Sequence, residues 1–416
     1  MPVIGKGTSV ENVPSNEALA SIFVDAIEVG YRHFDTASVY GTEETIGVAI
    51  AKAIDEVFIT SKPWNTDAHC DLIVPALKTT LKTFQNTSKP AENMEEKRIP
   101  EVILNSGKKM PLIGLGTASI PLPPHETFTS ILIDAFEVGY RHFDTASMYG
   151  SEEPLGKAVE KALELGIVKS RDEVFITSKL WPSDAHPDLV LPALKTSLQK
   201  LGLEYVDLYL IHFPVRMKPE AKGPYDILKE NVIPSFDMKG VWEAMEECCR
   251  LGLAKSIGVS NFGIKKLNQL LENATIPPAV NQVEMNLSWQ QAKLREFCKQ
   301  KGIHVSAWSP LGAYKSDYGT NAVMESPILK EIACARQKTI AQIALRWIYE
   351  EGASAIVRSF NKERMKENLE LFDWELSEEE SQKFRHIPQL RMFSGINFVS
   401  ENGPYKSLEE FWDGDP

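Results

Sequence analysis

Eight short apolar runs, rich in β-branched and aromatic residues, alternate with stretches of helical apolar spacing from residue 99 to the end of this chain. The strands that this pattern predicts span residues 111–117, 140–146, 173–180, 206–213, 254–261, 279–286, 303–310 and 354–360. Between them, apolar residues recur at helical intervals in stretches such as 128–136 and 267–274. Eight strands that alternate with helices over about 250 residues predict a parallel (β/α)8 TIM barrel.

A doubly wound sheet is the structural alternative, because the segment 114–119 (GLGTAS) resembles the start of a dinucleotide-binding fingerprint. The third glycine of that fingerprint is missing, and no acidic residue ends a following strand at the required distance. The glycines therefore do not support a doubly wound fold, and the barrel is favoured.

The beginning of the chain repeats a later part of it. Residues 1–47 recur from Met110, so that Asp35 corresponds to Asp144 and Tyr40 to Tyr149. The next matching segment begins at residue 55 and again at 172 and brings Lys62 onto Lys179, but the offset has risen from 109 to 117. The first copy thus lacks the eight residues equivalent to 164–171, and it ends after Leu81.

Three strands cannot close an eight-stranded barrel, and they leave sheet edges open. We therefore expect residues 1–82 to be a truncated, non-catalytic repeat of the first barrel strands and helices. Residues 83–98 are polar and are expected to form a linker, and residues 99–416 are expected to form the complete barrel. The first copy has no counterpart of any candidate site residue beyond the third strand.

The composition disfavours several kinds of partner. The chain has 45 basic and 57 acidic residues, a net charge of −12, which argues against a general nucleic-acid or anionic-membrane surface. It has no apolar run of about 18 residues, and its N-terminus does not resemble a signal peptide. Its five scattered cysteines have no metal-binding spacing and indicate free thiols. We expect a cytoplasmic protein with no metal, nucleic-acid or membrane partner.

Every predicted strand closes with a polar or ionisable residue. The carboxyl ends of the strands in a parallel barrel form one face, and chemistry takes place there. Packing alone rarely places a polar group at every strand end, so we expect a functional site on this face. The residues in question are Thr117, Asp144, Lys179, His212, Ser260, Asn261, Gln282, Ser309, Arg358 and Ser359.

Asp144, Tyr149, Lys179 and His212 come from three successive strand ends and are predicted to meet. The phenol of a tyrosine has a pKa near 10, and a neighbouring ammonium lowers it. Asp144 is expected to hold Lys179 charged and in place, while His212 donates a hydrogen bond to a substrate oxygen. Together they form a proton donor for a carbonyl oxygen that becomes negative as hydride arrives.

A hydride donor must be a bound cofactor, since no side chain supplies hydride. The amides and hydroxyl of Ser260, Asn261 and Gln282 suit a carboxamide, and Trp308 offers a flat face for a nicotinamide ring.

A phosphate site is predicted near the last strand. Arg358, Ser359 and Arg364 lie beside a helix that is expected to start at about Asn361. Arginine binds phosphate through two hydrogen bonds, and a helix N-terminus favours anions. A 2′-phosphate, and therefore NADPH rather than NADH, is expected.

These motifs, in this order, resemble the aldo-keto reductase superfamily over essentially all of residues 99–416. The matching segments are 139–156, 176–181, 208–214, 257–262, 281–286, 308–312 and 357–368. The resemblance implies a monomeric barrel that binds an extended cofactor. It implies that Tyr149 is the general acid, Lys179 lowers its pKa, Asp144 positions Lys179, and His212 binds the carbonyl oxygen. Members that reduce steroid C=C bonds carry Glu at the position of His212, so C=O reduction is expected.

The same resemblance assigns the remaining cofactor contacts. Ser260, Asn261 and Gln282 would hold the carboxamide, and Trp308 stands where the family often has a stacking tyrosine. Arg358 stands where many members have lysine, which preserves the charge. The other residues expected to line the cofactor are Thr117, Ser309, Leu311, Ser359, Arg364, Glu367 and Asn368.

Within the superfamily, segments 239–262 and 359–376 are similar to reductases of plant specialised metabolism, including alkaloid reductases. The expected substrate is a small-molecule ketone or aldehyde. Substrate choice in the family depends on variable loops, here about 214–238 and 387–416. Apolar candidates for the pocket are Trp181, Phe213, Phe393, Phe398 and Trp412.

Two other functions remain open at this point. Some barrels of this family are non-catalytic regulatory subunits that keep the cofactor site, although the complete set of four catalytic residues argues against that role here. The reductase could also act on an unstable intermediate supplied by a partner polyketide synthase.

Overall fold

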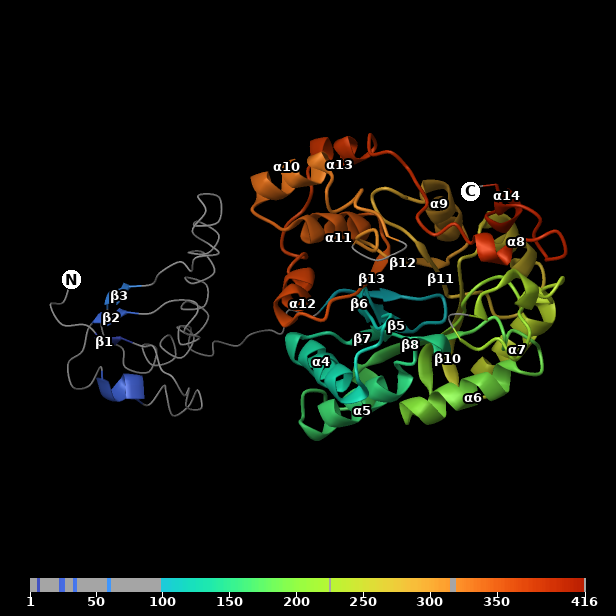
Figure 1. Ribbon diagram of the computed structural model, residues 1–416, viewed down its shortest axis with the longest axis horizontal. Helices are drawn as coiled ribbons and strands as arrows, with labels where there is room; N and C mark the ends of the chain where they lie inside the picture. Colours follow the sequence, from blue (N-terminus) through green and yellow to red (C-terminus); the bar gives the residue numbers. More distant parts are fainter. Residues whose placement is uncertain are drawn as a thin grey trace. The chain divides into compact units, whose positions relative to one another are not determined.

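The computed structural model describes residues 99–223, 226–314 and 319–414, together with residues 6–7, 22–26, 33–35 and 58–60. The chain divides into two compact units, Met1–Lys97 and Arg98–Pro416 (Figure 1). Each is considered by itself.

In the first unit, three short strands form a parallel sheet in the order β1 (Lys6–Gly7), β2 (His33–Asp35) and β3 (Phe58–Thr60). Residues 22–26 are helical, and the buried rings of Phe23 and Phe34 meet edge to face with their centroids 6.0 Å apart. Asp35 ends β2. Tyr40, Lys62 and the expected linker lie outside the described residues.

The second unit is a closed parallel barrel in the order β10-β11-β12-β13-β6-β7-β8-β9, which confirms the predicted TIM barrel. Each strand lies within one of the eight ranges expected from the sequence. The strands are β6 (Ile113–Gly116), β7 (His142–Asp144), β8 (Phe175–Leu180), β9 (Val206–Ile211), β10 (Ala254–Ser260), β11 (Val280–Glu284), β12 (His304–Trp308) and β13 (Ser354–Val357).

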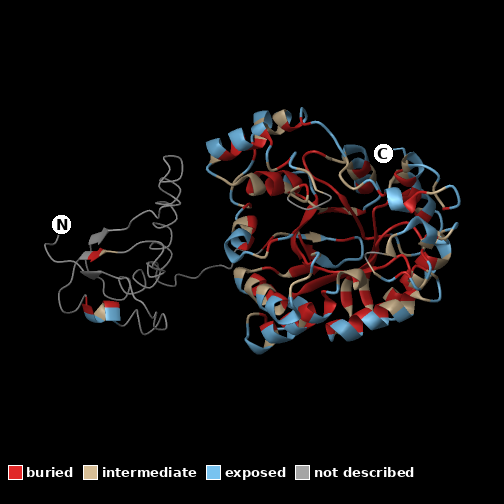
Figure 2. Cartoon of the chain, in the orientation of Figure 1, coloured by how far each residue is buried: buried red, intermediate tan, exposed pale blue. Residues whose placement is uncertain are grey.

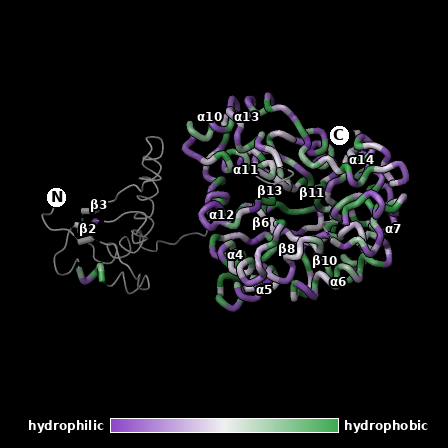
Figure 3. Tube along the Cα trace, viewed as in Figure 1, coloured by the Kyte–Doolittle hydropathy of each residue, from purple (hydrophilic) through white to green (hydrophobic). Residues whose placement is uncertain are grey.

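Helices surround the barrel, with buried faces against the strands and exposed faces outward (Figure 2). Hydrophobic and hydrophilic residues alternate along these helices (Figure 3). Local signals fix several ends: a capping box joins Thr339 and Gln342 at the start of α11, and Gly139 ends α4 with a φ of 114°. The helices are α4 (His125–Val138), α5 (Glu152–Glu164), α6 (Val190–Leu201), α7 (Met238–Arg250), α8 (Ile264–Leu271), α9 (Ala292–Gln300), α10 (Pro327–Arg336), α11 (Ile340–Glu350), α12 (Lys362–Leu369), α13 (Glu378–Phe384) and α14 (Leu408–Phe411).

An antiparallel hairpin precedes the barrel and was not predicted. It pairs β4 (Glu101–Ile103) with β5 (Lys109–Pro111), so Pro111 belongs to the hairpin and not to the first barrel strand. Met110 is fully buried in one cluster with Phe175 and Val280, the first residues of β8 and β11. The hairpin therefore covers the amino-terminal end of the barrel and leaves the carboxyl end for a site.

Other expectations concern membrane spans, metal sites and thiols. None of the described helices is long and apolar enough to cross a bilayer. Within the same residues, no group of three or more acidic, His or Cys side chains is arranged to hold a metal ion. Cys248, Cys249, Cys298 and Cys334 are free thiols, and Cys70 lies outside the described residues.

Candidate active site

A buried ion pair lies at the carboxyl end of the barrel. Lys179 of β8 donates from Nζ to Asp144 Oδ1 at 2.5 Å and to the carbonyl of Thr145 at 3.0 Å. The other carboxylate oxygen of Asp144 accepts a hydrogen bond from Gln282 Nε2 at 2.8 Å. Lys179 is only 1% exposed, and this burial lowers its pKa while Asp144 opposes the shift. The carboxylate thus holds the ammonium in one orientation.

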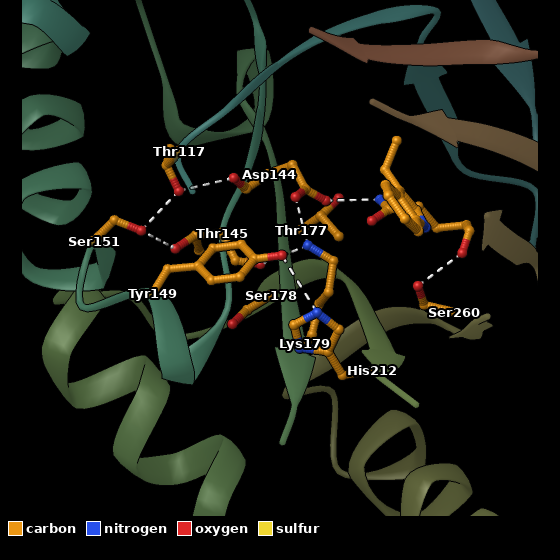
Figure 4. Close-up of polar contacts among 12 residues, drawn as sticks. Thr117, Asp144, Thr145, Tyr149, Ser151, Thr177, Ser178, Lys179, His212 and Ser260 are labelled. Atoms are coloured by element: carbon orange, nitrogen blue, oxygen red, sulfur yellow. Dashed lines mark hydrogen bonds and ion pairs between the residues drawn. The ribbon is translucent and has the colours of Figure 1, made fainter. Parts of the chain in front are cut away.

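Tyr149 and His212 meet beside this pair (Figure 4). Tyr149 Oη lies 3.3 Å from His212 Nε2, and Lys179 Nζ lies 5.0 Å from the centroid of the Tyr149 ring. Tyr149 is half-buried at the end of a 3₁₀ turn, Ser147–Tyr149, whereas His212 is buried directly after β9. The structure therefore brings the four predicted residues together.

His212 is held neutral. Burial, and secondarily the charge of Lys179, keep the pKa of its imidazole well below the usual range. Its ring stacks on Phe213 at 5.1 Å and meets the edge of Trp181 at 5.2 Å. A neutral imidazole carries one N–H, so it can donate a hydrogen bond at Nε2 without adding a second positive charge beside Lys179.

Behind the ion pair, hydroxyl groups connect β6, β7 and α5. Thr117 Oγ1 donates to the carbonyl of Asp144 at 2.9 Å and lies 2.7 Å from Ser151 Oγ, which in turn lies 2.7 Å from Thr145 Oγ1. Thr117 is fully buried, and its predicted contact with the cofactor stays a prediction. The network fixes the backbone around Asp144. Sequence reasoning missed Thr145, a hydroxyl residue within the predicted Asp144–Tyr149 turn, and Ser151, which follows that turn.

The predicted carboxamide residues form one connected group. Asn261 Nδ2 donates to the carbonyl of His212 at 2.9 Å and to Ser260 Oγ at 3.1 Å, while Trp308 Nε1 donates to Asn261 Oδ1 at 3.0 Å. Asn261 and Ser309 have φ values of 65° and 50°, a conformation that non-glycine residues adopt rarely. Such strain is typical of functional sites, where the surrounding structure enforces it.

The predicted phosphate residues lie around the start of α12. Asn361 caps this helix by accepting a hydrogen bond from the amide of Arg364 at 2.9 Å. Arg358 is exposed and donates to the carbonyl of Ala118 at 3.0 Å, and Arg364 is also exposed. Glu367 and Asn368 lie further along α12, and Ser309 and Leu311 follow β12, half-buried.

The five predicted pocket residues lie in one aromatic cluster beside His212. Phe213 meets Phe393 with ring centroids 5.6 Å apart and Phe398 at 4.9 Å, and Trp181 meets Phe213 at 6.2 Å. Trp412 is 5% exposed and meets Phe393 at 6.4 Å. Phe393 is the half-buried member, and the other four are buried.

Sequence reasoning also missed Glu284, a buried carboxylate at the end of β11. Its two oxygens accept hydrogen bonds from the amides of Met392 and Phe393 at 2.8 and 3.0 Å. No local pattern signals a contact across 108 residues. The only signal was the presence of an acidic residue in a predicted buried strand.

Comparisons with known proteins identify the family of this chain. The profile of the aldo/keto reductase family matches residues 3–89 and 112–388. The chain is 59% identical to rhazimal reductase 2 of Alstonia scholaris over 319 residues, 76% of this chain and 98% of that protein. It is 53% identical to NADPH-dependent codeinone reductase 1-4 of Papaver somniferum over 320 residues, 77% of this chain and 99% of that protein.

Among solved structures, an aldo-keto reductase of Bombyx mori in complex with NADP superimposes with a TM-score of 0.65 at 35% identity, covering 71% of this chain and 95% of that one. The fold is that of a barrel oxidoreductase. The chain belongs to the aldo/keto reductase family and is an enzyme of the carbonyl-reducing class.

Proposed function

We propose that this chain is an NADPH-dependent carbonyl reductase in which Tyr149 protonates the substrate oxygen. The observation that carries the proposal is the position of Tyr149 Oη, 3.3 Å from His212 Nε2 and beside the buried Lys179–Asp144 pair. Family membership and the similarity to reductases that use NADP support the reaction class and the cofactor.

The residues fit a phosphorylated dinucleotide. Arg358 and Arg364 are exposed cations at the N-terminus of α12, and neither forms an ion pair with a described residue, whereas the adjacent Lys362 is paired with Asp134 and Glu137. Guanidinium groups that lack an ion-pair partner and lie at a helix N-terminus suit a phosphomonoester. Bound NADPH would supply hydride for the carbonyl carbon.

The chain's own residues would then supply the proton and stabilise the developing negative charge. His212 Nε2 donates a hydrogen bond to the carbonyl oxygen and orients it toward Tyr149. As negative charge develops on that oxygen, Tyr149 transfers its proton, and the ammonium of Lys179 stabilises the phenolate that is left. Asp144 keeps the ammonium directed at the phenol, because one of its oxygens binds Lys179 and the other is fixed by Gln282.

The decisive experiment follows NADPH absorbance with a test aldehyde. Tyr149→Phe should lower the rate by about 10²–10⁴-fold, as removal of a general acid typically does. Tyr205→Phe is the matched control, because the Tyr205 hydroxyl donates to Asp172 before the start of β9, at the other end of the barrel. A wild-type protein that binds NADPH but turns over no carbonyl compound would instead support a regulatory barrel.

For the substrate we propose a bulky, largely apolar ketone or aldehyde of specialised metabolism. The aromatic cluster of Trp181, Phe213 and Phe393 beside His212 supports this class, as does the similarity to an enzyme named for codeinone. Alkaloid ketones, sugar aldehydes and polyketide-derived carbonyls, each assayed with NADPH and NADH, would identify it. If the substrate is an unstable intermediate supplied by a partner synthase, we expect turnover only when that synthase is present.

We further propose that the enzyme is a cytoplasmic monomer and that residues 1–82 take no part in catalysis. The free thiols of the described cysteines support the location. Sedimentation of the purified chain and microscopy of a tagged copy test the oligomeric state and the location.

A further inference from the structure

The tail of the chain crosses the carboxyl end of the barrel and is tied to it by a buried charge. Glu284, the last residue of β11, is 1% exposed. Its Oε1 accepts from the amide of Met392 at 2.8 Å and its Oε2 from the amide of Phe393 at 3.0 Å. Both carboxylate oxygens are therefore used to hold two consecutive tail residues, and hydrogen bonds of this kind are stronger than those between neutral groups.

The residue held in this way is the one that closes the aromatic cluster. The Phe393 ring lies 5.6 Å from Phe213, next to His212, and 6.2 Å from Trp308, at the end of β12. Phe393 therefore lies between Phe213, which adjoins the imidazole proposed to bind the carbonyl, and Trp308, which is expected to stack on the cofactor. A change in its position would change the width of the space in front of the catalytic residues.

Strand geometry makes β11 a common support for both parts of the site. Gln282 and Glu284 are two residues apart, so their side chains point to the same face of the strand. Gln282 binds Asp144, and Glu284 pairs in register with Trp308 on β12. The same strand, β11, thus holds both the catalytic ion pair and the tail in place.

We propose that Glu284 is a positioning residue that sets the enzyme's preference among substrates of different size by fixing Phe393. The inference rests on the proposed carbonyl reduction. The carboxylate acts through the two tail amides, and it needs no contact with substrate or cofactor.

A second attachment of the tail limits how much of it would loosen when the Glu284 carboxylate is removed. At the far end of the tail, Asp413 forms a buried ion pair with Lys266, and its Oδ2 also accepts from the amide of Lys266 at 3.0 Å in the first turn of α8. The indole of Trp412 donates to the carbonyl of Ser394 at 2.8 Å. Removing the Glu284 charge should therefore loosen the segment around Phe393 and leave the rest of the tail attached.

The test compares Glu284→Gln, Phe393→Ala, the double variant and wild type in the full-length chain. The glutamine side chain introduced by Glu284→Gln would present its N–H₂ group to one of the two tail amides, so one hydrogen bond must be lost. Glu272→Gln is the matched control, because Glu272 is an exposed glutamate. Two quantities are measured: amide hydrogen exchange at residues 392 and 393, and the ratio of kcat/KM for a bulky aromatic ketone to that for a small aldehyde.

The expected result has three parts. Glu284→Gln lowers the exchange protection of at least one of the two amides by about tenfold or more. It changes the substrate ratio in the same direction as Phe393→Ala, and the double variant changes it no further, because the two residues act as one unit. Glu272→Gln changes neither quantity. The inference would be overturned if Glu284→Gln left the exchange protection or the kcat/KM ratio unchanged. It would also be overturned if the effects of the two substitutions on that ratio multiplied in the double variant.

A parallel binding measurement separates this inference from the proposed function. Quenching of tryptophan fluorescence gives the Kd ratio for the same two carbonyl compounds without turnover. If wild type reduces neither compound, the proposed function fails, and the Kd ratio of Glu284→Gln against wild type still decides whether Glu284 sets the preference.

Discussion

The two copies of the repeated segment build the same local sheet in different settings. In the first unit, Phe34 pairs with Lys6 and with Ile59; in the barrel, Phe143 pairs with Leu115 and with Ile176. These pairs are equivalent under the offsets of 109 and 117 residues, so the register is the same. Only the second copy continues into β9–β13, which close the barrel. Local pairing is thus encoded in the segment, while the site depends on strands that the first copy lacks.

The comparison is sharpest at one matched position. Leu115 of β6 is fully buried in the barrel core, and the first copy has Lys6 there. A charged side chain is rarely buried without a partner, because leaving water costs several kcal/mol. Lys6 therefore disfavours replacement of β6 by β1 within the barrel, and it argues that the first copy cannot substitute for the second.

The largest effect is expected for Lys179→Met in the full-length chain. Loss of the ammonium beside Tyr149 should lower kcat by about 10²–10³-fold, a typical cost of losing one electrostatic contact to developing charge. Lys62→Met, the matched change in the first copy, should leave kcat unaltered. Steady-state rates of both variants check this. Residual activity in Lys179→Met that disappears when Lys62 is also changed would mean that the first copy contributes to catalysis.

A second effect concerns the histidine shared by the two copies, His142 in β7 and His33 in β2. His142 is fully buried between the carbonyl of Pro111 and Thr177 Oγ1, and burial lowers its pKa from 6.5 to about 4. Below pH 6.5 this histidine is protonated in the unfolded chain but stays neutral in the folded barrel. The free energy of unfolding therefore decreases as the pH is lowered from about 6.5 to about 4. The loss attributable to this group is about 3 kcal/mol.

Urea unfolding of wild type and His142→Gln between about pH 7 and about pH 4 measures this loss. The variant is expected to be less stable at neutral pH and to lose less further stability on acidification. His304 is half-buried, and its pKa is also lowered to about 4, so the pH dependence should decrease without vanishing. Identical slopes for the two proteins would show that His142 titrates normally.

A smaller effect is expected at the predicted phosphate residues, which have no counterpart in the first copy. Arg364→Ala should raise KM for NADPH by about tenfold and leave KM for NADH unchanged, because a hydrogen bond to a charged group contributes about 1.5–3 kcal/mol. Lys366→Ala, a change at an exposed residue of the same helix, serves as the control. An equal rise for both cofactors would place Arg364 away from a 2′-phosphate.

The eight barrel strands could be predicted from the sequence because apolar periodicity and strand-end polar residues are local signals. The hairpin β4–β5 had a weaker signal, since the turn residues Ser106 and Gly107 follow the β-rich run of β4, and Gly107 adopts a φ of 78°. The attachment of the tail to the barrel had no local sequence signal. Asp413 on Lys266 and Met392 on Glu284 are contacts over more than a hundred residues, and only the folded chain brings them together.

The smallest effect is expected from removing residues 1–98. The barrel closes without the first unit, and the two units are compact separately. Residues 99–416 retain the hairpin that covers the amino-terminal end and every residue of the candidate site. The truncated protein should therefore keep kcat/KM and the free energy of unfolding of the barrel, as measured by NADPH oxidation and urea titration of both forms. A folded but inactive truncation would mean that the first copy completes the site, and the distinction drawn from Lys6 and Leu115 would then be wrong.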